Sequence, residues 1–278
     1  MTTRAARLVV CAAALSAAAS GCVRPSHVEE PIPAAEDEAQ RRPFLSPLSL
    51  TADPLDDAIV RVVAAGSCTG TLIADDLVLT AHHCIVERDA RGRMLPQDRA
   101  PSSIRIELGG DHMPWGEVGV RQVVSADCGY VQGEGDIAIL VLDRKLVGMP
   151  TFVPRLESPP VLGESLTPWG FGRCALEQGA VHRQVRDGGR IEATSRGVFT
   201  VQASICPGDS GGPVLDARRE IVGVVSSSLM DGDAATRSTS YFARLDRFAV
   251  LFSAAKEIAA GASPAELPPF RSCEPAAP

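Results

Sequence analysis

Short runs rich in valine and isoleucine recur through the middle of the chain, and turn residues separate them. The ten clearest runs cover residues 58–63, 69–73, 77–80, 104–108, 118–124, 137–142, 181–186, 198–202, 221–226 and 239–244. Runs of this length and spacing predict β-strands joined by turns. We therefore expect an antiparallel all-β protein, either a sandwich or a barrel.

One helical pattern follows the last of these runs. Between residues 245 and 259, apolar side chains recur at helical spacing, at Phe248, Leu251, Phe252 and Ile258. We expect this helix to close the folded domain.

The first 22 residues have the layout of a secretory signal. Arg4 and Arg7 precede an apolar run, and small residues end the segment. That end, Ala19-Ser20-Gly21-Cys22, resembles the lipobox of bacterial lipoproteins, in which the cysteine is lipidated. We expect residues 1–22 to be a signal peptide of the lipoprotein type. The protein would then be an exported lipoprotein of the cell envelope, with a secreted or periplasmic location as the alternative.

Two polar or proline-rich segments flank the strand-like region. Residues 23–57 carry eight acids and three bases, which gives −5 of the formal net charge of −7, and are expected to form a disordered tether or propeptide. Residues 261–278 are expected to be a loose tail except at Cys273. The rest of the chain is only mildly acidic, which disfavours nucleic acid as a partner. After the signal no apolar run approaches the roughly 20 residues of a membrane span, so membrane attachment is expected only through an N-terminal lipid.

The stretch from Cys206 to Pro213 places a single hydroxyl among glycines. Gly208 and Gly211 allow a sharp turn that exposes Ser210 and aims backbone N–H groups at an oxyanion. An ordinary surface turn is the alternative, because Gly, Asp, Ser and Pro also form such turns. A nucleophilic serine needs a base and a group that orients the base.

Candidates for both partners occur at the ends of strand-like runs. His83 follows such a run directly before Cys84, and Asp136 opens an apolar strand, where a carboxylate needs a partner. A metal site made of His82, His83 and Cys84 is disfavoured. Neighbouring strand residues point to opposite faces, and no second pair of ligands accompanies them.

These three segments resemble motifs of the chymotrypsin or trypsin-like serine protease family. Residues 80–84 read T-A-H-H-C for the family's T-A-A-H-C, residues 136–140 read D-I-A-I-L for D-I-A-L-L, and residues 208–213 read G-D-S-G-G-P. They follow the family's order. The resemblance covers 58–260 and implies two packed antiparallel β-barrels, about 58–153 and about 154–244, with the helix at 245–259.

The resemblance also implies a function, that of an exported bacterial serine endopeptidase. Ser210 would attack the peptide carbonyl, His83 would act as the base and Asp136 would orient it, while Gly208 and Ser210 would supply the oxyanion hole. The family needs no metal or organic cofactor. Its partners are protein or peptide substrates, and we expect a monomer.

The family's disulfide at the histidine implies a bridge between Cys68 and Cys84. Four further cysteines permit three pairings, of which we select Cys174 with Cys206 and Cys128 with Cys273.

Ser204, six residues before Ser210, is expected at the base of the specificity pocket, and Ser226 to Ser228 would form its wall. An uncharged pocket of this kind predicts cleavage after small or medium uncharged residues.

The chain departs from the family's pattern in one residue and in its activation site. His82 replaces the usual alanine, and we expect it to face away from Ser210. Activation by cleavage before Ile59 is disfavoured because that residue lies only nine positions before Cys68. We therefore expect Asp209 to be satisfied by an arginine or by backbone donors.

Two other function classes are weighed against the protease. A binding or regulatory module on the same fold would hydrolyse nothing, and the complete set of His, Asp and Ser disfavours it. An esterase of the α/β-hydrolase type would need the G-x-S-x-G motif and the order Ser, Asp, His, and this chain has neither.

Overall fold

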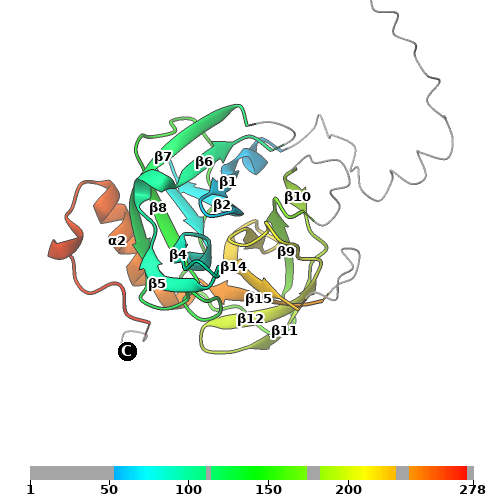
Figure 1. Ribbon diagram of the computed structural model, residues 1–278. Coiled ribbons are helices and arrows are strands. Elements are labelled where there is room, and N and C mark those ends of the chain that lie inside the picture. Colours follow the sequence, from blue (N-terminus) through cyan, green and yellow to red (C-terminus); the bar gives the residue numbers. More distant parts are fainter. Residues whose placement is uncertain (1–52, 111–113, 174–181, 230–237, 274–278) are drawn as a thin grey trace, which may run out of the picture. The chain divides into compact units, whose positions relative to one another are not determined.

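The computed structural model describes residues 53–110, 114–173, 182–229 and 238–273. Its strands form two antiparallel barrels, as expected (Figure 1). The first barrel closes in the order β1 (Ile59–Val63), β2 (Ser67–Ala74), β3 (Leu77–Thr80), β8 (Ala138–Leu142), β7 (Gly116–Ser125) and β6 (Arg105–Leu108). A separate hairpin joins β4 (Val86–Arg88) to β5 (Met94–Asp98).

The second barrel follows after a connection from residue 143 to residue 164. Its sheet has the order β10 (Gln184–Val185), β9 (Ser165–Gly170), β11 (Gly189–Thr194), β12 (Val198–Ala203), β15 (Ser238–Arg244), β14 (Ile221–Ser228) and β13 (Pro213–Leu215). A further pairing of β9 with β13 closes this sheet.

All ten predicted runs overlap a strand, although the run at 181–186 contains only the two residues of β10. Five strands were not predicted: β4, β5, β9, β11 and β13. They have three to six residues each, and the runs of valine and isoleucine that predict strands do not cover them. β9 alternates buried residues with more exposed ones, whereas all three residues of β13 are buried.

The hydrophobic core has two parts. The larger cluster fills the first barrel and includes Leu251 and Phe252 of the C-terminal helix. The smaller cluster fills the second barrel, where the rings of Phe199 and Phe242 stack with centroids 5.3 Å apart. Burying each such side chain contributes about 1.5–3 kcal/mol, so both barrels have a core of their own.

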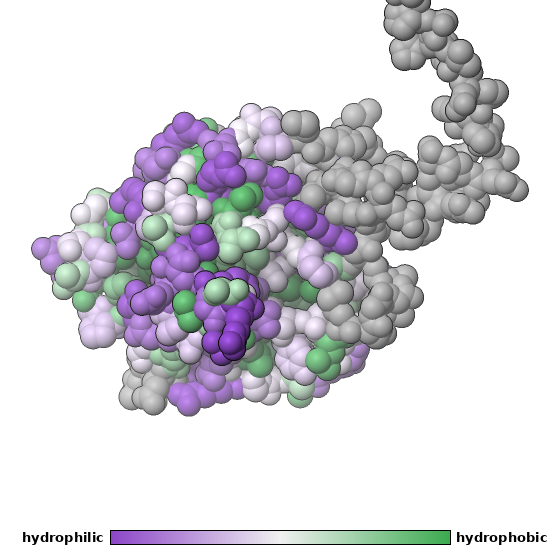
Figure 2. All heavy atoms as spheres, viewed as in Figure 1, coloured by the Kyte–Doolittle hydropathy of each residue, from purple (hydrophilic) through white to green (hydrophobic). Residues whose placement is uncertain are grey.

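The predicted helix forms as a short 3-10 turn, η4 (Asp246–Phe248), followed by α2 (Ala249–Ala259). Although α2 follows the second barrel in the chain, it packs against β8 and β7 of the first (Figure 1). None of the helices in the described ranges is both long and apolar enough to cross a membrane. Figure 2 shows a face on which hydrophilic residues surround small hydrophobic areas.

The folded region extends beyond both of its predicted boundaries. All but the last residue of a 3-10 turn, η1 (Pro54–Ala58), lies within the predicted tether. Arg219 forms ion pairs with Asp53 and Asp56 of this segment. In the predicted loose tail, η5 (Pro264–Glu266) precedes Leu267 and Phe270, which pack against the larger core cluster. Specific ion pairs and two apolar side chains order segments whose average composition predicts disorder.

Candidate active site

The pairing of β3 with β8 brings His83 and Asp136 together. Thr80 pairs with Ala138, so the end of β3 lies beside the start of β8. His83 follows in a 3-10 turn, η2 (His82–Cys84), and Asp136 lies two residues before β8. His83 Nδ1 lies 2.8 Å from Asp136 Oδ2, and the His83 backbone N–H donates to Asp136 Oδ1 at 2.9 Å.

Asp136 is fully buried, and hydrogen bonds compensate its charge. Besides the two bonds from His83, it accepts one from the Ser226 hydroxyl at 2.5 Å. That hydroxyl accepts in turn from the Gly133 N–H at 2.8 Å. A carboxylate only accepts, so the Nδ1 of His83 carries the proton and its Nε2 is the basic nitrogen.

The serine lies in a turn that requires glycine on both sides. Gly208 and Gly211 have φ angles of 108° and 80°, in the region that favours glycine. A Cβ on Gly211 would lie 2.2 Å from Thr80 Oγ1, so a side chain would push the turn off the first barrel. Ser210, between them, is partly exposed.

Hydrogen bonds tie this turn to both barrels. From β2, the Thr69 N–H donates to the Ser210 carbonyl at 2.8 Å, and the Thr69 hydroxyl donates to the Gly208 carbonyl at 2.7 Å. From β14, the Val225 carbonyl accepts from the Gly211 N–H at 2.8 Å. Thr69 was not identified as a site residue from the sequence. Its only signal was a polar residue in a strand-like run beside the histidine motif.

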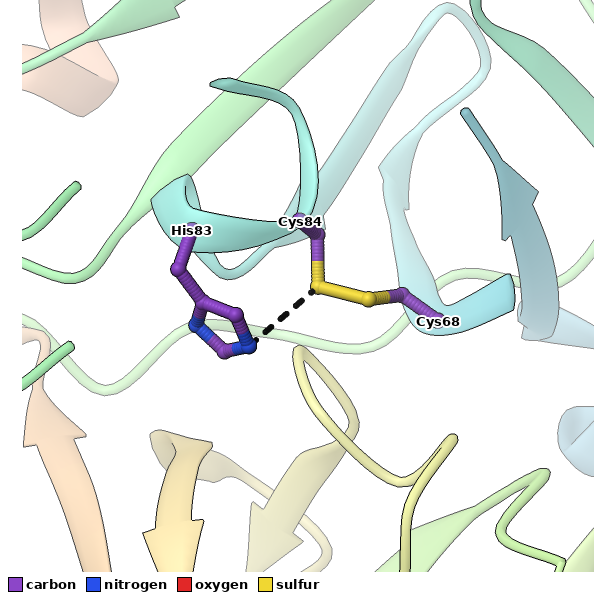
Figure 3. Close-up of side chains that lie close together, drawn as sticks. All are labelled: Cys68, His83 and Cys84. Carbon is purple, nitrogen blue, oxygen red and sulfur yellow. Dashed lines mark hydrogen bonds between the residues drawn. A yellow bond between two sulfur atoms is a disulfide. The ribbon is translucent and has the colours of Figure 1, made fainter. Parts of the chain in front are cut away.

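Ser210 and His83 meet at the disulfide of the histidine turn. Cys84 Sγ lies 3.8 Å from His83 Nε2 (Figure 3). The same sulfur lies 3.7 Å from the Ser210 carbonyl oxygen. Within the described ranges, Ser210 Oγ makes no hydrogen bond. The structure therefore brings the three predicted residues together and forms the His83–Asp136 hydrogen bond. Hydrogen bonds to a nucleophile are often long before substrate binds.

The backbone beside Ser210 leaves two donors available. The Asp209 N–H donates to the Cys206 carbonyl at 3.0 Å. Among the residues that the structure describes, the N–H groups of Gly208 and Ser210 have no acceptor. Two unpaired N–H groups on one turn are the arrangement that binds a developing oxyanion.

Asp209 is fully buried and has three partners. It accepts from the N–H groups of Gly172 at 2.7 Å and Cys206 at 2.9 Å, and Arg186 Nε lies 2.8 Å away in an ion pair without hydrogen-bond alignment. Burial raises the pKa of Asp209, and Arg186 and the two amides oppose this rise. The expected arginine and backbone donors are confirmed. Ile59 lies buried within β1.

Two disulfides agree with the predicted pairings. Cys68 is bridged to Cys84, and Cys128 is bridged to Cys273. The predicted pairing of Cys206 with Cys174 is not tested, because residue 174 lies outside the described residues.

The ring of His83 and the sulfur atoms of Cys68 and Cys84 lie within 4.8 Å of one another. Both sulfur atoms belong to the disulfide, so neither is a thiolate that could bind a metal.

Serine hydroxyls gather where β12 and β14 end and β15 begins. Ser228 pairs with Ser240 across the strands, and its hydroxyl lies 3.0 Å from that of Ser240 and 2.9 Å from that of Ser238. The Ser240 hydroxyl also reaches the carbonyl of Ala203, the residue before Ser204, at 3.3 Å. We call Ser228, Ser238 and Ser240 the hydroxyl cluster.

The predicted specificity wall includes Ser226, whose hydroxyl has a partner within the protein. The buried hydroxyl of Ser226 serves Asp136, so it is not available to a substrate side chain. Ser238 and Ser240 were not identified from the sequence. The sequence feature that could have identified them is their separation by two positions, which places both side chains on one face of a strand.

His82 contacts different groups from His83. Its Nδ1 lies 2.7 Å from the Cys128 carbonyl oxygen, and its Nε2 lies 2.7 Å from Asp98 Oδ1. The expectation that His82 faces away from Ser210 agrees with these contacts. The two residues lie in η2 and not in a strand.

Comparisons with known proteins agree with this architecture. A family model described as Trypsin matches residues 51–251. A trypsin from Sarcophaga bullata is 23% identical over 207 residues, which cover 64% of this chain and 75% of that protein.

Solved structures share the fold at low sequence identity. A Glu endopeptidase in complex with MPD has a TM-score of 0.60 at 20% identity, covering 74% of this chain and 94% of that one. Mouse neuropsin, a serine protease, has a TM-score of 0.56 at 18% identity, with 74% and 96% covered. A scabies mite inactivated protease paralogue has a TM-score of 0.54 at 20% identity, with 72% and 96% covered.

Proposed function

The chain belongs to the trypsin family, and from this premise we propose that it is a serine endopeptidase that uses Ser210, His83 and Asp136. The observation that carries the proposal is the buried His83–Asp136 hydrogen bond beside the Ser210 turn. It leaves a basic nitrogen on the side of the ring that faces the Cys84 sulfur, which also contacts Ser210.

The proposed reaction has two halves. Ser210 Oγ attacks the peptide carbonyl carbon while His83 Nε2 takes the hydroxyl proton, and His83 then gives that proton to the leaving amine. Water next attacks the acyl-enzyme, with His83 again taking a proton and returning it to Ser210. The N–H groups of Gly208 and Ser210 stabilise the oxyanion in both halves, by about 2.7–4 kcal/mol for each donor.

We propose that the protease is competent without a cleavage before Ile59. In such activation, a new amino terminus would pair with the acid before the serine. Here Arg186 and two backbone amides already satisfy Asp209. The turn that carries Ser210 therefore has its supporting ion pair in the uncut chain.

The specificity proposal rests on the hydroxyl cluster. Ser228 and Ser240 face each other across two strands and carry no charge, and Ser204 follows the residue that Ser240 contacts. Side chains at these positions narrow the space for a substrate and offer no partner for Lys or Arg. We expect cleavage after small or medium uncharged residues.

The disulfides and the family fold suggest an extracellular or secreted protein. We further propose that the chain is carried on a lipid attached to Cys22, a residue outside the described ranges. The mass of the N-terminal peptide of the mature protein tests this. An unmodified terminus elsewhere would contradict it.

A binding module on the protease fold is the second candidate. The missing hydrogen bond of Ser210 Oγ favours it, and the scabies mite paralogue carries the word inactivated in its name. The two candidates differ in whether Ser210 reacts.

Hydrolysis of a peptide library by the full chain separates them. We expect cleavage by the wild type and by His82→Ala, and none above background by Ser210→Ala or His83→Ala. Cleavage by Ser210→Ala equal to that of the wild type would refute the assignment. Near-normal cleavage by His83→Ala would transfer the role of the base to His82. A strong preference for Arg would refute the specificity.

A further inference from the structure

His82 is buried between two hydrogen-bond acceptors. Its Nδ1 faces the Cys128 carbonyl and its Nε2 faces Asp98, each at 2.7 Å, and only 3% of the residue is exposed. The carbonyl has no proton to give, so Nδ1 donates. Asp98 also accepts from the Ser125 hydroxyl at 2.6 Å. Burial acts to raise the pKa of Asp98, but the hydrogen bonds with His82 and Ser125 and the electrostatic attraction of His82 and Arg271 together lower the pKa. Nε2 therefore faces an ionised carboxylate.

Cys128 is packed directly against the segment that carries Asp136. A Cβ on Gly129 would lie 2.2 Å from the Asp136 nitrogen, and a Cβ on Gly135 would lie 2.1 Å from Cys128 Sγ. Both glycines have positive φ angles, of 80° and 75°, so the backbone here is adapted to close approach. Because no space separates the two segments, a shift of Cys128 moves Asp136.

The tail beyond α2 holds the other side of the same loop. Cys273 is bridged to Cys128, and Arg271 Nε donates to Asp127 at 2.7 Å. The Asp127 N–H donates to the Arg271 carbonyl at 2.9 Å. Cys128 is therefore held by a covalent bridge to the tail and by the hydrogen bond from His82 to its carbonyl.

These contacts form a closed series that includes both His83 and Asp136. The series runs from His82 to the Cys128 carbonyl, through Gly135 to Asp136, and from Asp136 back to His83, the residue next to His82. We propose that His82 is a positioning residue, which holds Asp136 against His83 through its hydrogen bond to the Cys128 carbonyl. This inference rests on the proposed function.

Three substitutions separate the two hydrogen bonds of His82. In His82→Asn the side-chain amide can take the place of Nδ1 and keep the bond to Cys128, whereas in His82→Gln it can take the place of Nε2 and keep the bond to Asp98. His82→Ala keeps neither. For the full chain we expect kcat of the Asn variant within threefold of the wild type. The Gln and Ala variants should lose about tenfold in kcat, with KM changed less than twofold.

Asp98→Asn is the matched control for stability. It removes the carboxylate without touching the bond to Cys128, so it should lower the melting temperature and leave kcat within threefold of the wild type. A purely structural role of His82 would make kcat follow the melting temperature in all four variants. Equal kcat for the Asn and Gln variants, or an equal loss in Asp98→Asn and His82→Gln, would overturn the proposal.

A readout without substrate separates this inference from the proposed function. The downfield proton resonance of the His83 Nδ1–H reports its hydrogen bond to Asp136. We expect this resonance to persist in His82→Asn and to shift or broaden in His82→Gln and His82→Ala. A wild type that hydrolyses nothing would defeat the proposed function and leave this test intact. An unchanged resonance in every variant would defeat the positioning role.

Discussion

Asp136 and Asp209 are both fully buried carboxylates beside Ser210, but they have different kinds of partners. Asp136 accepts from a hydroxyl and from a histidine ring, and that ring can gain a proton. Asp209 is paired with Arg186, a cation that keeps its proton throughout the pH range of proteins.

The difference in partners indicates that Asp136 takes part in the reaction and that Asp209 supports the structure. A carboxylate opposite a histidine can stabilise a proton that arrives on that histidine during a reaction. A carboxylate opposite an arginine holds the chain in place, because the arginine takes up no proton during a reaction. The first barrel therefore supplies the reactive pair, and the second barrel supplies a fixed ion pair beneath the serine turn.

Asp136→Asn should have the largest effect on activity. The amide can donate to His83, which favours the wrong tautomer, so we expect kcat to fall by about 10⁴-fold, the magnitude characteristic of this change in the Ser-His-Asp mechanism. The melting temperature should change little. Steady-state kinetics test this, with the exposed Asp143→Asn as the control. A kcat within tenfold of the wild type would remove Asp136 from the reaction.

Arg186→Met should have the largest effect on stability. Arg186 is only 9% exposed and Asp209 is fully buried, so the variant leaves a buried carboxylate without its cation. Breaking such a pair costs about 3–5 kcal/mol of unfolding free energy. Denaturant unfolding measures it, and Arg190→Met, at an exposed arginine of β11, should change it by less than about 1 kcal/mol. Equal losses in the two variants would show that the ion pair supports nothing.

The loss in Arg186→Met should depend on pH. Burial raises the pKa of Asp209, and the variant removes the cation that opposes this. A carboxyl whose folded-state pKa is raised binds its proton more tightly when folded, so stability falls as pH rises from the unfolded-state pKa of about 3.9 toward the folded-state value. Unfolding from pH 4 to pH 8 should therefore show a difference from the wild type that grows with pH. A difference that shrinks would contradict the raised pKa.

Ser226→Ala should have the smallest effect of these changes. It removes one of three hydrogen bonds to Asp136, and a hydrogen bond to a charged group contributes about 1.5–3 kcal/mol. We expect kcat/KM to fall by about tenfold. Ser253→Ala, at an exposed position of α2, is the control and should leave kcat/KM unchanged. If both variants behave alike, Ser226 does not support Asp136.

Motifs and strand periodicity predicted much of this arrangement. The strand ends predicted for 77–80 and 137–142 lie where the structure has them, to within a residue, and their pairing is what brings His83 to Asp136. Three ordered motifs likewise sufficed to predict two barrels and the bridge from Cys68 to Cys84.

The remaining features depend on contacts between distant segments, which local patterns do not encode. Arg186 pairs with Asp209 from a strand-like run that carries no motif. Ser226 was predicted as a pocket residue, and its hydroxyl contacts Asp136. The tail at 261–273 had a disordered composition, but Arg271 and Cys273 bind a loop more than a hundred residues earlier. Such pairings require the folded chain.

Labelling of the uncut full chain with a fluorophosphonate probe tests the central claim most directly. An activated serine in a turn supported by Arg186 should react once per molecule, and mass spectrometry should find the label on Ser210. Ser210→Ala should not be labelled, and Arg186→Met should be labelled more slowly. A wild type that stays unlabelled until the chain is cut before Ile59 would contradict the claim of competence without cleavage. One that is never labelled would contradict the protease itself.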